Sequence, residues 1–272
     1  MMTKSSGGGD KEMKFGFSLA YGPELSLPEL GQLPLWPGRY GEVSGRLMEM
    51  KKAMALLLRR RRGWIGFNAA EIISSGVSRS IAGQNDSIIS DFKRELFRLL
   101  GAMRQRPECV IVDLGVEEAR HDPAFRRALL RMLHGMAMDL YLNQVTLALP
   151  VRVPGGEDGF DVFCLELRNQ LMNRQLGFSI DIHPHEMTEK LCDPAGQLRW
   201  LKFDLAAIRF FYEPETGNHL VARAVAPWLR FLATTPFAGQ VTFCPRCATV
   251  EIMGHEMTAI RELLSRLPAE SE

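Results

Sequence analysis

One stretch joins a buried strand to a cluster of ionisable side chains: Gly177-Phe178-Ser179-Ile180-Asp181-Ile182-His183-Pro184-His185-Glu186. A short apolar run between glycine and proline is typical of a strand in a parallel sheet. Asp181, His183 and His185 follow at its carboxyl end, the end at which α/β proteins bind their ligands. The stretch therefore predicts a buried strand that opens onto a functional site.

Runs of the same kind recur along the chain, and helical patterns separate them. Apolar runs predict strands at residues 14–20, 64–70, 109–114, 145–153, 177–183, 207–213 and 240–245, with a weaker one within 33–40. Apolar residues at helical spacing predict helices at 42–62, 86–104, 123–142, 160–173, 186–192, 219–233 and 250–267. This alternation gives either a closed (β/α)₈ barrel or an open doubly wound sheet.

Chain length and the first loop separate these two architectures. The 272 residues suit a barrel, for which about 250 residues are typical. An open sheet that binds a dinucleotide needs G-x-G-x-x-G after its first strand, and the chain reads Tyr-Gly-Pro-Glu-Leu-Ser at 21–26. We predict a single (β/α)₈ TIM barrel over residues 13–272, after a disordered, Ser/Gly-rich tail at 1–12.

Composition narrows the class of partner. The chain has 33 basic and 32 acidic residues and a net charge of +1, which gives no electrostatic reason to expect a nucleic acid or a membrane surface. No apolar run approaches the roughly 20 residues that span a bilayer, and residues 1–12 do not resemble a signal peptide. Five cysteines, an odd number, predict a reducing cytoplasm rather than a disulfide framework. We expect a small-molecule ligand, while the sequence leaves the oligomeric state open.

The side chains at predicted strand ends are the candidate site. Asp181, His183 and His185 alternate and could share one face; together they suit a divalent metal, or they form a polar loop that caps the next helix. Asp113 ends an apolar strand, so its carboxylate lies either in the site or against the loop above it. Glu213 holds the same position on its own strand.

Two arginines and a cysteine pair complete the candidates. Arg152 and Arg246 follow predicted strands and should reach the same rim, where guanidinium groups suit phosphate or carboxylate; ordinary surface salt bridges are the alternative. Cys244 and Cys247 form one C-x-x-C. That spacing fits a redox or zinc motif, and equally two buried, inert cysteines.

With this layout, the chain resembles the sugar phosphate isomerase/epimerase family, the xylose isomerase-like TIM barrels, from Lys14 to Leu267. The run at 176–183 resembles the family's sixth strand, and Asp181 matches a metal ligand there. The resemblance implies a divalent metal (Mn, Zn or Mg) that polarises a carbonyl while a carboxylate or histidine moves the proton. Asn68 and Asp113 stand where the family often has histidine. The glutamates usual at the ends of the fifth and last strands are absent, because the chain reads Leu-Pro-Val at 149–151 and Phe-Cys-Pro-Arg at 243–246.

These observations predict a sugar isomerase- or epimerase-like protein that binds a polyhydroxylated or phosphorylated ligand at the carboxyl-terminal mouth. The alternative is a barrel without catalysis that serves as a binding or assembly protein. A third possibility, hydrolysis at abasic sites in DNA, ranks last because it needs a richer set of histidines and glutamates and a basic face. The predicted roles are proton transfer by Asp181, His183 and Asp113; metal binding by Asp181, His183 and His185; and ligand contact by Asn68, Arg152, Glu213 and Arg246.

Overall fold

Eight parallel strands pair in chain order and close into a barrel, β8 lying against β1. The computed structural model describes residues 14–36, 38, 40–44, 50–60, 66–70, 90–94, 96–98, 109–152, 167, 169, 175–183, 205–214, 225, 228, 229, 232, 237 and 239–266. The predicted (β/α)₈ barrel is confirmed. The strands are β1 (Lys14–Ser18), β2 (Tyr40–Ser44), β3 (Gly66–Ala70), β4 (Cys109–Ile111), β5 (Thr146–Arg152), β6 (Leu176–Ile182), β7 (Leu205–Tyr212) and β8 (Gln240–Pro245).

The strand registers close with the displacement expected of such a barrel. From Asp181 on β6, paired residues lead through β7, β8, β1 and β2 to Gly66 on β3. Four residues further along β3, Ala70 leads through β4 and β5 to Gly177, four residues before Asp181. The circuit is thus displaced by eight residues, four on β3 and four on β6, which matches the shear of a (β/α)₈ barrel.

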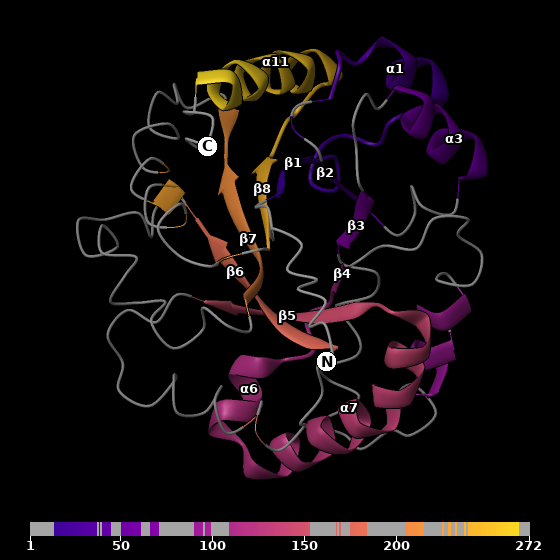
Figure 1. The fold of residues 1–272 in the computed structure, drawn as a ribbon, viewed down its shortest axis with the longest axis vertical. Helices are drawn as coiled ribbons and strands as arrows, with labels where there is room; N and C mark the ends of the chain where they lie inside the picture. Colours follow the sequence, from indigo (N-terminus) through magenta and orange to yellow (C-terminus); the bar gives the residue numbers. More distant parts are fainter. Residues whose placement is uncertain are drawn as a thin grey trace, which may run out of the picture.

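The described helices lie at both ends of the molecule as drawn in Figure 1, with the strands between them. Helices α1, α3 and α11 lie together at one end of the molecule, and α6 and α7 lie at the opposite end. Among the described residues, no helix is both long enough and apolar enough to cross a membrane. The helix bounds are α1 (Leu27–Gln32), α3 (Lys51–Arg60), α6 (Val116–His121), α7 (Pro123–Asn143) and α11 (Val250–Arg266).

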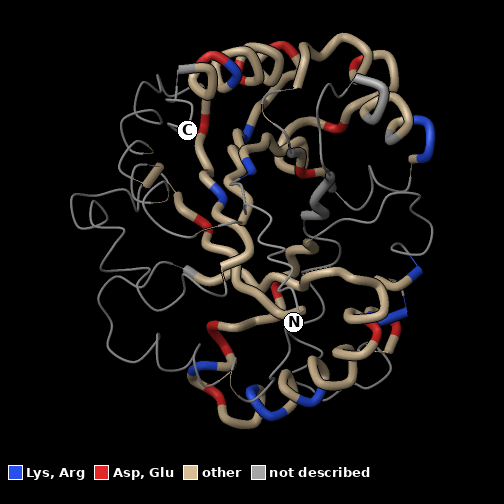
Figure 2. Tube along the Cα trace, in the orientation of Figure 1, with Lys and Arg blue, Asp and Glu red and all other residues tan. Residues whose placement is uncertain are grey.

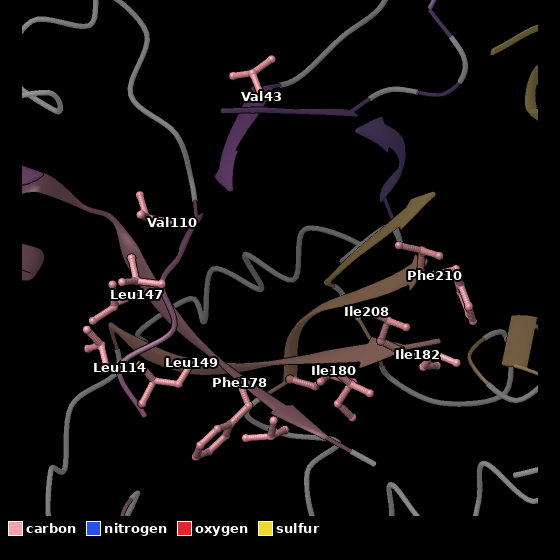
Figure 3. Packing of buried hydrophobic residues seen from close by; sticks show 14 of the residues in the cluster. Val43, Val110, Leu114, Leu147, Leu149, Phe178, Ile180, Ile182, Ile208 and Phe210 are labelled. Atoms are coloured by element: carbon pink, nitrogen blue, oxygen red, sulfur yellow. The ribbon is translucent and has the colours of Figure 1, made fainter. Parts of the chain in front are cut away.

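The hydrophobic core lies between the strands and the helices. Successive residues of a strand face opposite sides, and one set packs with the apolar faces of α7 and α11 in a single buried cluster. Figure 3 shows part of this set, including Phe178, Ile180 and Ile182 of β6 and Ile208 and Phe210 of β7. The alternate set therefore points into the barrel.

Helix α7 shows how local sequence fixes an element. Asp122 accepts hydrogen bonds from the backbone N–H groups of Ala124 and Phe125 at 2.8 and 3.2 Å, and Pro123 occupies the first turn. Both features stabilise a helix amino terminus. The helix ends at Gln144, which adopts the left-handed conformation with φ 54°. The sequence had predicted this helix within two residues.

The structure corrects the prediction between the first and third strands. The weak strand predicted within 33–40 lies at Tyr40–Ser44, and the helix predicted from 42 begins only at Lys51. Val43 suits either pattern, but Glu42 and Val43 are both buried, on opposite faces of β2. A residue buried on each face of one segment is typical of a barrel strand.

Two short helices were not predicted. Helix α1 begins in a capping box, in which the Ser26 N–H donates to the Glu29 carboxylate and the Glu29 N–H donates to Ser26 Oγ. Helix α6 follows Gly115, whose φ of 76° is the left-handed region that favours glycine. Neither helix is long enough to show a clear 3.6-residue period. The helices predicted at 160–173 and 186–192 lie largely or wholly outside the described residues.

Charged positions of both signs are spread along the described chain. Figure 2 shows acidic and basic positions close together on α6 and on α11. This distribution agrees with the net charge of +1.

Candidate functional site

A cluster of polar side chains fills the inner face of the barrel near the carboxyl ends of its strands. It comprises Ser18 on β1, Glu42 on β2, Asp181 on β6 and Arg209 on β7. Each lies within three residues of the carboxyl end of its strand. These residues alternate with the apolar set that packs on the helices, so the strand period places them together inside the barrel.

Arg209 is the centre of this cluster. Its Nε donates to Asp181 Oδ1 at 2.7 Å, and its Nη2 donates to Asp181 Oδ2 at 2.5 Å, which makes a bidentate pair. Its Nη1 donates to the Tyr21 hydroxyl at 2.5 Å and lies 3.5 Å from Glu42 Oε1. The side chain of Arg209 is only 1% exposed, so a full positive charge is buried among three oxygen-bearing side chains.

The ionisation of Arg209 depends on its two carboxylate neighbours. Burial alone would lower its pKa, but Asp181, Glu42 and Tyr21 together raise the pKa well above its usual value. Arg209 is therefore permanently charged. Removing either carboxylate would leave part of a buried charge uncompensated, which is costly.

Glu42 is the unusual acid of the cluster. Its Oε1 accepts a hydrogen bond from Ser18 Oγ at 3.1 Å, while its Oε2 has no hydrogen-bond partner among the described residues. The same holds for the buried hydroxyl of Thr242 on β8. Burial raises the pKa of Glu42 from 4.5 to about 6, and the neighbouring Arg209 offsets only part of this effect. Glu42 therefore takes up a proton under mildly acidic conditions.

Aromatic rings cover the polar cluster on the side of the mouth. The Phe211 ring lies 4.8 Å from the His183 ring in a stacked arrangement, and the Tyr21 ring meets it edge-on at 4.8 Å. The Arg209 guanidinium lies 5.1 Å from the centre of Phe211, and that of Arg246 lies 5.9 Å from it. Phe211 thus contacts a buried arginine, an exposed arginine and the ring of His183.

The structure brings two of the predicted catalytic residues together. The Asp181 side chain is 18% exposed, and half-buried His183 follows it just past the end of β6. Asp113 is exposed and accepts a hydrogen bond from the Gly115 N–H at 3.0 Å, so it lies against the loop before α6. Glu213 and Arg246 are also exposed, immediately after β7 and β8.

Three predicted residues have no described side chain. Asn68 lies in β3, and Arg152 is the last residue of β5, where its backbone pairs in register with Asp181. Both positions are at or near the carboxyl ends of their strands. His185, predicted as a metal ligand, lies outside the described residues. Their roles remain predictions.

The described residues do not fit a metal centre. Within them, no group of three or more His, Cys, Asp or Glu side chains could hold a metal ion. Asp181, the expected ligand, has both carboxylate oxygens bonded to Arg209. The second buried carboxylate, Glu42, faces the same guanidinium. A cation supplied by the protein thus lies between the acids that a metal would need.

The two cysteines of the C-x-x-C face different environments. Cys244 lies inside the barrel, and Cys247 belongs to the apolar cluster outside it. Both are buried, and both are thiols rather than halves of a disulfide. Burial, reinforced by Glu42, raises the pKa of the Cys244 thiol well above its usual value. The expectation that both cysteines are buried is confirmed.

Sequence reasoning missed Arg209, Glu42 and Tyr21. Arg209 interrupts the apolar run Ala-Ala-Ile-Arg-Phe-Phe-Tyr at 206–212, and a charge within such a run was a usable signal. Glu42 was hidden because its segment was predicted to be helical. Tyr21 follows β1 in a Gly/Pro-rich loop, and nothing local marks it.

Solved structures similar to this chain include sugar epimerases and a xylose isomerase domain protein. A xylose isomerase domain protein from Planctomyces limnophilus superposes with a TM-score of 0.60 at 12% identity, over 94% of this chain and 99% of that one. 3-Keto-D-glucoside 4-epimerase from E. coli superposes with a TM-score of 0.59 at 13% identity, over 93% of this chain and 98% of that one. D-Psicose 3-epimerase from Clostridium cellulolyticum superposes with a TM-score of 0.56 at 12% identity, over 95% of this chain and 93% of that one.

The fold is therefore that of the xylose isomerase-like TIM barrels. At 12–14% identity, the likeness establishes architecture alone. No sequence family matches the chain, and no curated protein does.

Proposed function

We propose that this barrel is a sugar isomerase or epimerase that binds a small polyhydroxylated ligand at its carboxyl-terminal mouth. The observation that carries the proposal is the partly exposed carboxylate of Asp181, held by two hydrogen bonds from Arg209 and followed two residues later by His183. Sugar epimerases with the same architecture support the choice of ligand class. The mouth of such barrels is where ligands bind.

Asp181 has acceptor capacity left for a ligand. Its Oδ1 accepts from Arg209 Nε and from Ser179 Oγ at 3.3 Å, whereas Oδ2 accepts only from Arg209 Nη2 among the described residues. A carboxylate oxygen has about two acceptor positions. Oδ2 can therefore take one further donor, and the hydroxyl groups of a sugar supply it.

His183 is the proposed proton carrier. Imidazole is the side chain whose ordinary pKa lies nearest neutral pH, which suits general acid–base catalysis. Neutral His183 would remove the proton from the carbon next to the ligand's carbonyl, leaving an enediolate. The resulting imidazolium would return that proton to the neighbouring carbon on the same face, while the hydroxyl proton moves to the former carbonyl oxygen, which completes an isomerisation. An epimerisation would need a second proton donor on the opposite face of the ligand. Stacking on Phe211 fixes the plane of the ring for this transfer.

Arg246 and Arg152 would accommodate an anionic ligand. Arg246 is exposed immediately after β8, with its guanidinium 5.9 Å from the Phe211 ring. The backbone of Arg152 pairs with that of Asp181 at the end of the neighbouring strand. Guanidinium groups at the rim suit a phosphate. A phosphorylated sugar is therefore included among the proposed ligands.

The test is solvent proton exchange. The protein is incubated in D₂O with ketopentoses, ketohexoses and their phosphates, and NMR follows deuterium at the carbon next to the carbonyl. We expect His183→Gln to slow exchange by roughly 10²- to 10⁴-fold, while His255→Gln, at an exposed position on α11, leaves it unchanged. Ligand binding without exchange in the wild type would refute catalysis and favour the binding-protein alternative. If no compound of the panel binds and none exchanges its proton, the proposal is refuted entirely.

A further inference from the structure

The guanidinium of Arg209 occupies the place of a cation between the buried Glu42 and the partly exposed Asp181. We propose that Arg209 is the permanent cation of this site, so that the mouth holds its ligand-facing carboxylate without a divalent metal. The inference concerns the same mouth as the proposed function and deepens it. It rests on the geometry of the described residues, and its test needs no turnover.

The contacts of Arg209 match what a bound metal would do for Asp181. A metal ion would fix the carboxylate by coordinating its oxygens, whereas here two parallel N–H donors fix both oxygens. Glu42 Oε1 lies 3.5 Å from the third nitrogen. The cluster thus has two acids around one cation, and its net charge is −1 when both acids are ionised.

The surroundings are specific for arginine. The guanidinium lies 5.8 Å from the centre of the Tyr21 ring and 5.1 Å from that of Phe211. A planar, weakly hydrated cation packs well against aromatic rings. The Tyr21 hydroxyl also accepts a hydrogen bond from Nη1. Since these partners engage all three nitrogens, Arg209 is held by the protein and is not left to bind the ligand.

A divalent ion would have to compete with this arrangement. It would need to displace charge-assisted hydrogen bonds from Asp181, and the adjacent guanidinium would repel it. The ligand would therefore meet Asp181 through hydrogen bonds from its hydroxyl groups rather than through a shared metal. This assigns Arg209 a positioning role: it orients Asp181 and does not touch the ligand.

The test compares metal responses of the wild type and an Arg209→Ala variant. Both are treated with EDTA, and thermal unfolding is recorded with Mn²⁺, Mg²⁺ or Zn²⁺ alone. We expect no metal-dependent shift in the wild type. Arg209→Ala should lose on the order of 10 °C, because it leaves the buried Glu42 and the partly exposed Asp181 without their counter-charge. Saturating Mn²⁺ should then restore roughly 5–10 °C.

Controls separate a specific effect from general destabilisation. Arg209→Ala combined with Asp181→Asn should show no metal rescue, and Arg261→Ala, at an exposed position on α11, should behave like the wild type. If Arg209→Ala does not fold, Arg209→Lys provides the variant: it keeps the charge and should remain metal-insensitive, with a lowered melting temperature.

One result would overturn the inference. If the purified wild type holds a stoichiometric divalent ion that is lost in Asp181→Asn, Arg209 is not the cation of the site. That result would leave the proposed sugar chemistry standing. Conversely, the absence of proton exchange would refute the proposed function without touching the metal result.

Discussion

Replacing Glu42 with glutamine tests the electrostatics of the buried cluster most directly. Burial raises the pKa of Glu42 from 4.5 to about 6 in the folded protein. Each pKa unit corresponds to about 1.4 kcal/mol, so this difference corresponds to about 2 kcal/mol of folding stability. Glutamine has nearly the same shape and does not titrate. The difference between wild type and variant therefore isolates the proton on Glu42.

The direction of the pH dependence follows from which state, folded or unfolded, holds the Glu42 proton more tightly. Below pH 4.5 Glu42 is protonated in both states, and its favourable contribution is fully present. As the pH rises, the unfolded chain ionises first, so the contribution falls and is lost as the pH passes about 6. The free energy of unfolding of the wild type, relative to Glu42→Gln, should therefore fall by about 2 kcal/mol between pH 4.5 and 7.

Urea unfolding at a series of pH values measures this difference. Glu29→Gln is the control. Hydrogen bonds with the hydroxyl and the backbone N–H of Ser26 lower the pKa of Glu29, so the stabilising contribution of Glu29 should be lost as the pH falls, whereas that of Glu42 is lost as the pH rises. A pH-independent difference between the wild type and Glu42→Gln would refute the reasoning. So would a wild type that gains stability relative to Glu42→Gln as the pH rises, since pairing with Arg209 would then outweigh burial.

Two further predictions concern the barrel itself. Gly38→Ala should destabilise the protein by roughly 1–3 kcal/mol, because Gly38 has φ +79° and an added Cβ would overlap the Phe15 carbonyl. Gly254→Ala, within α11, should instead stabilise the protein by about 0.5–1 kcal/mol, because the added Cβ would lie 3.6 Å from Pro34 Cδ, an ordinary contact distance. Similar urea midpoints for the two variants would contradict this account. Tyr212→Phe should cost about 1–2 kcal/mol, because the buried Tyr212 hydroxyl donates to Glu256 Oε2 at 2.8 Å and ties β7 to α11. Tyr141→Phe, at an exposed position on α7, should change stability by less than about 0.5 kcal/mol. An equal loss in both variants would show that the Tyr212–Glu256 hydrogen bond does not stabilise the fold.

The strands of this barrel were largely predictable from local pattern. Seven apolar runs coincide with strands, because both faces of a barrel strand are buried and its sequence is continuously apolar. β2 was the exception. Its five residues include Glu42 and Gly41, and the pairing with β1 and β3 defines the strand more than its composition does. Figure 1 shows the closure that the alternation of elements predicted: β1 and β8, distant in sequence, lie side by side.

The site was predictable only in part. Asp181 and His183 could be found because they end an apolar strand, and strand ends meet at the mouth of a barrel. Their chemistry could not be found. The partner of Asp181 is 28 residues away on β7, and the other acid is on β2. The sequence suggested a metal at Asp181, whereas the described structure surrounds that carboxylate with an arginine.

By itself, the sequence determined the (β/α)₈ alternation and one wall of the mouth, because both depend on side-chain period within single segments. Only the tertiary structure decided that Glu42 is a strand residue and that Arg209 lies between two carboxylates. Closing the barrel brings β2, β6 and β7 around one axis, and burial there sets the pKa of Glu42 and the charge balance of the site. Those quantities depend on distances between segments, which no local pattern encodes.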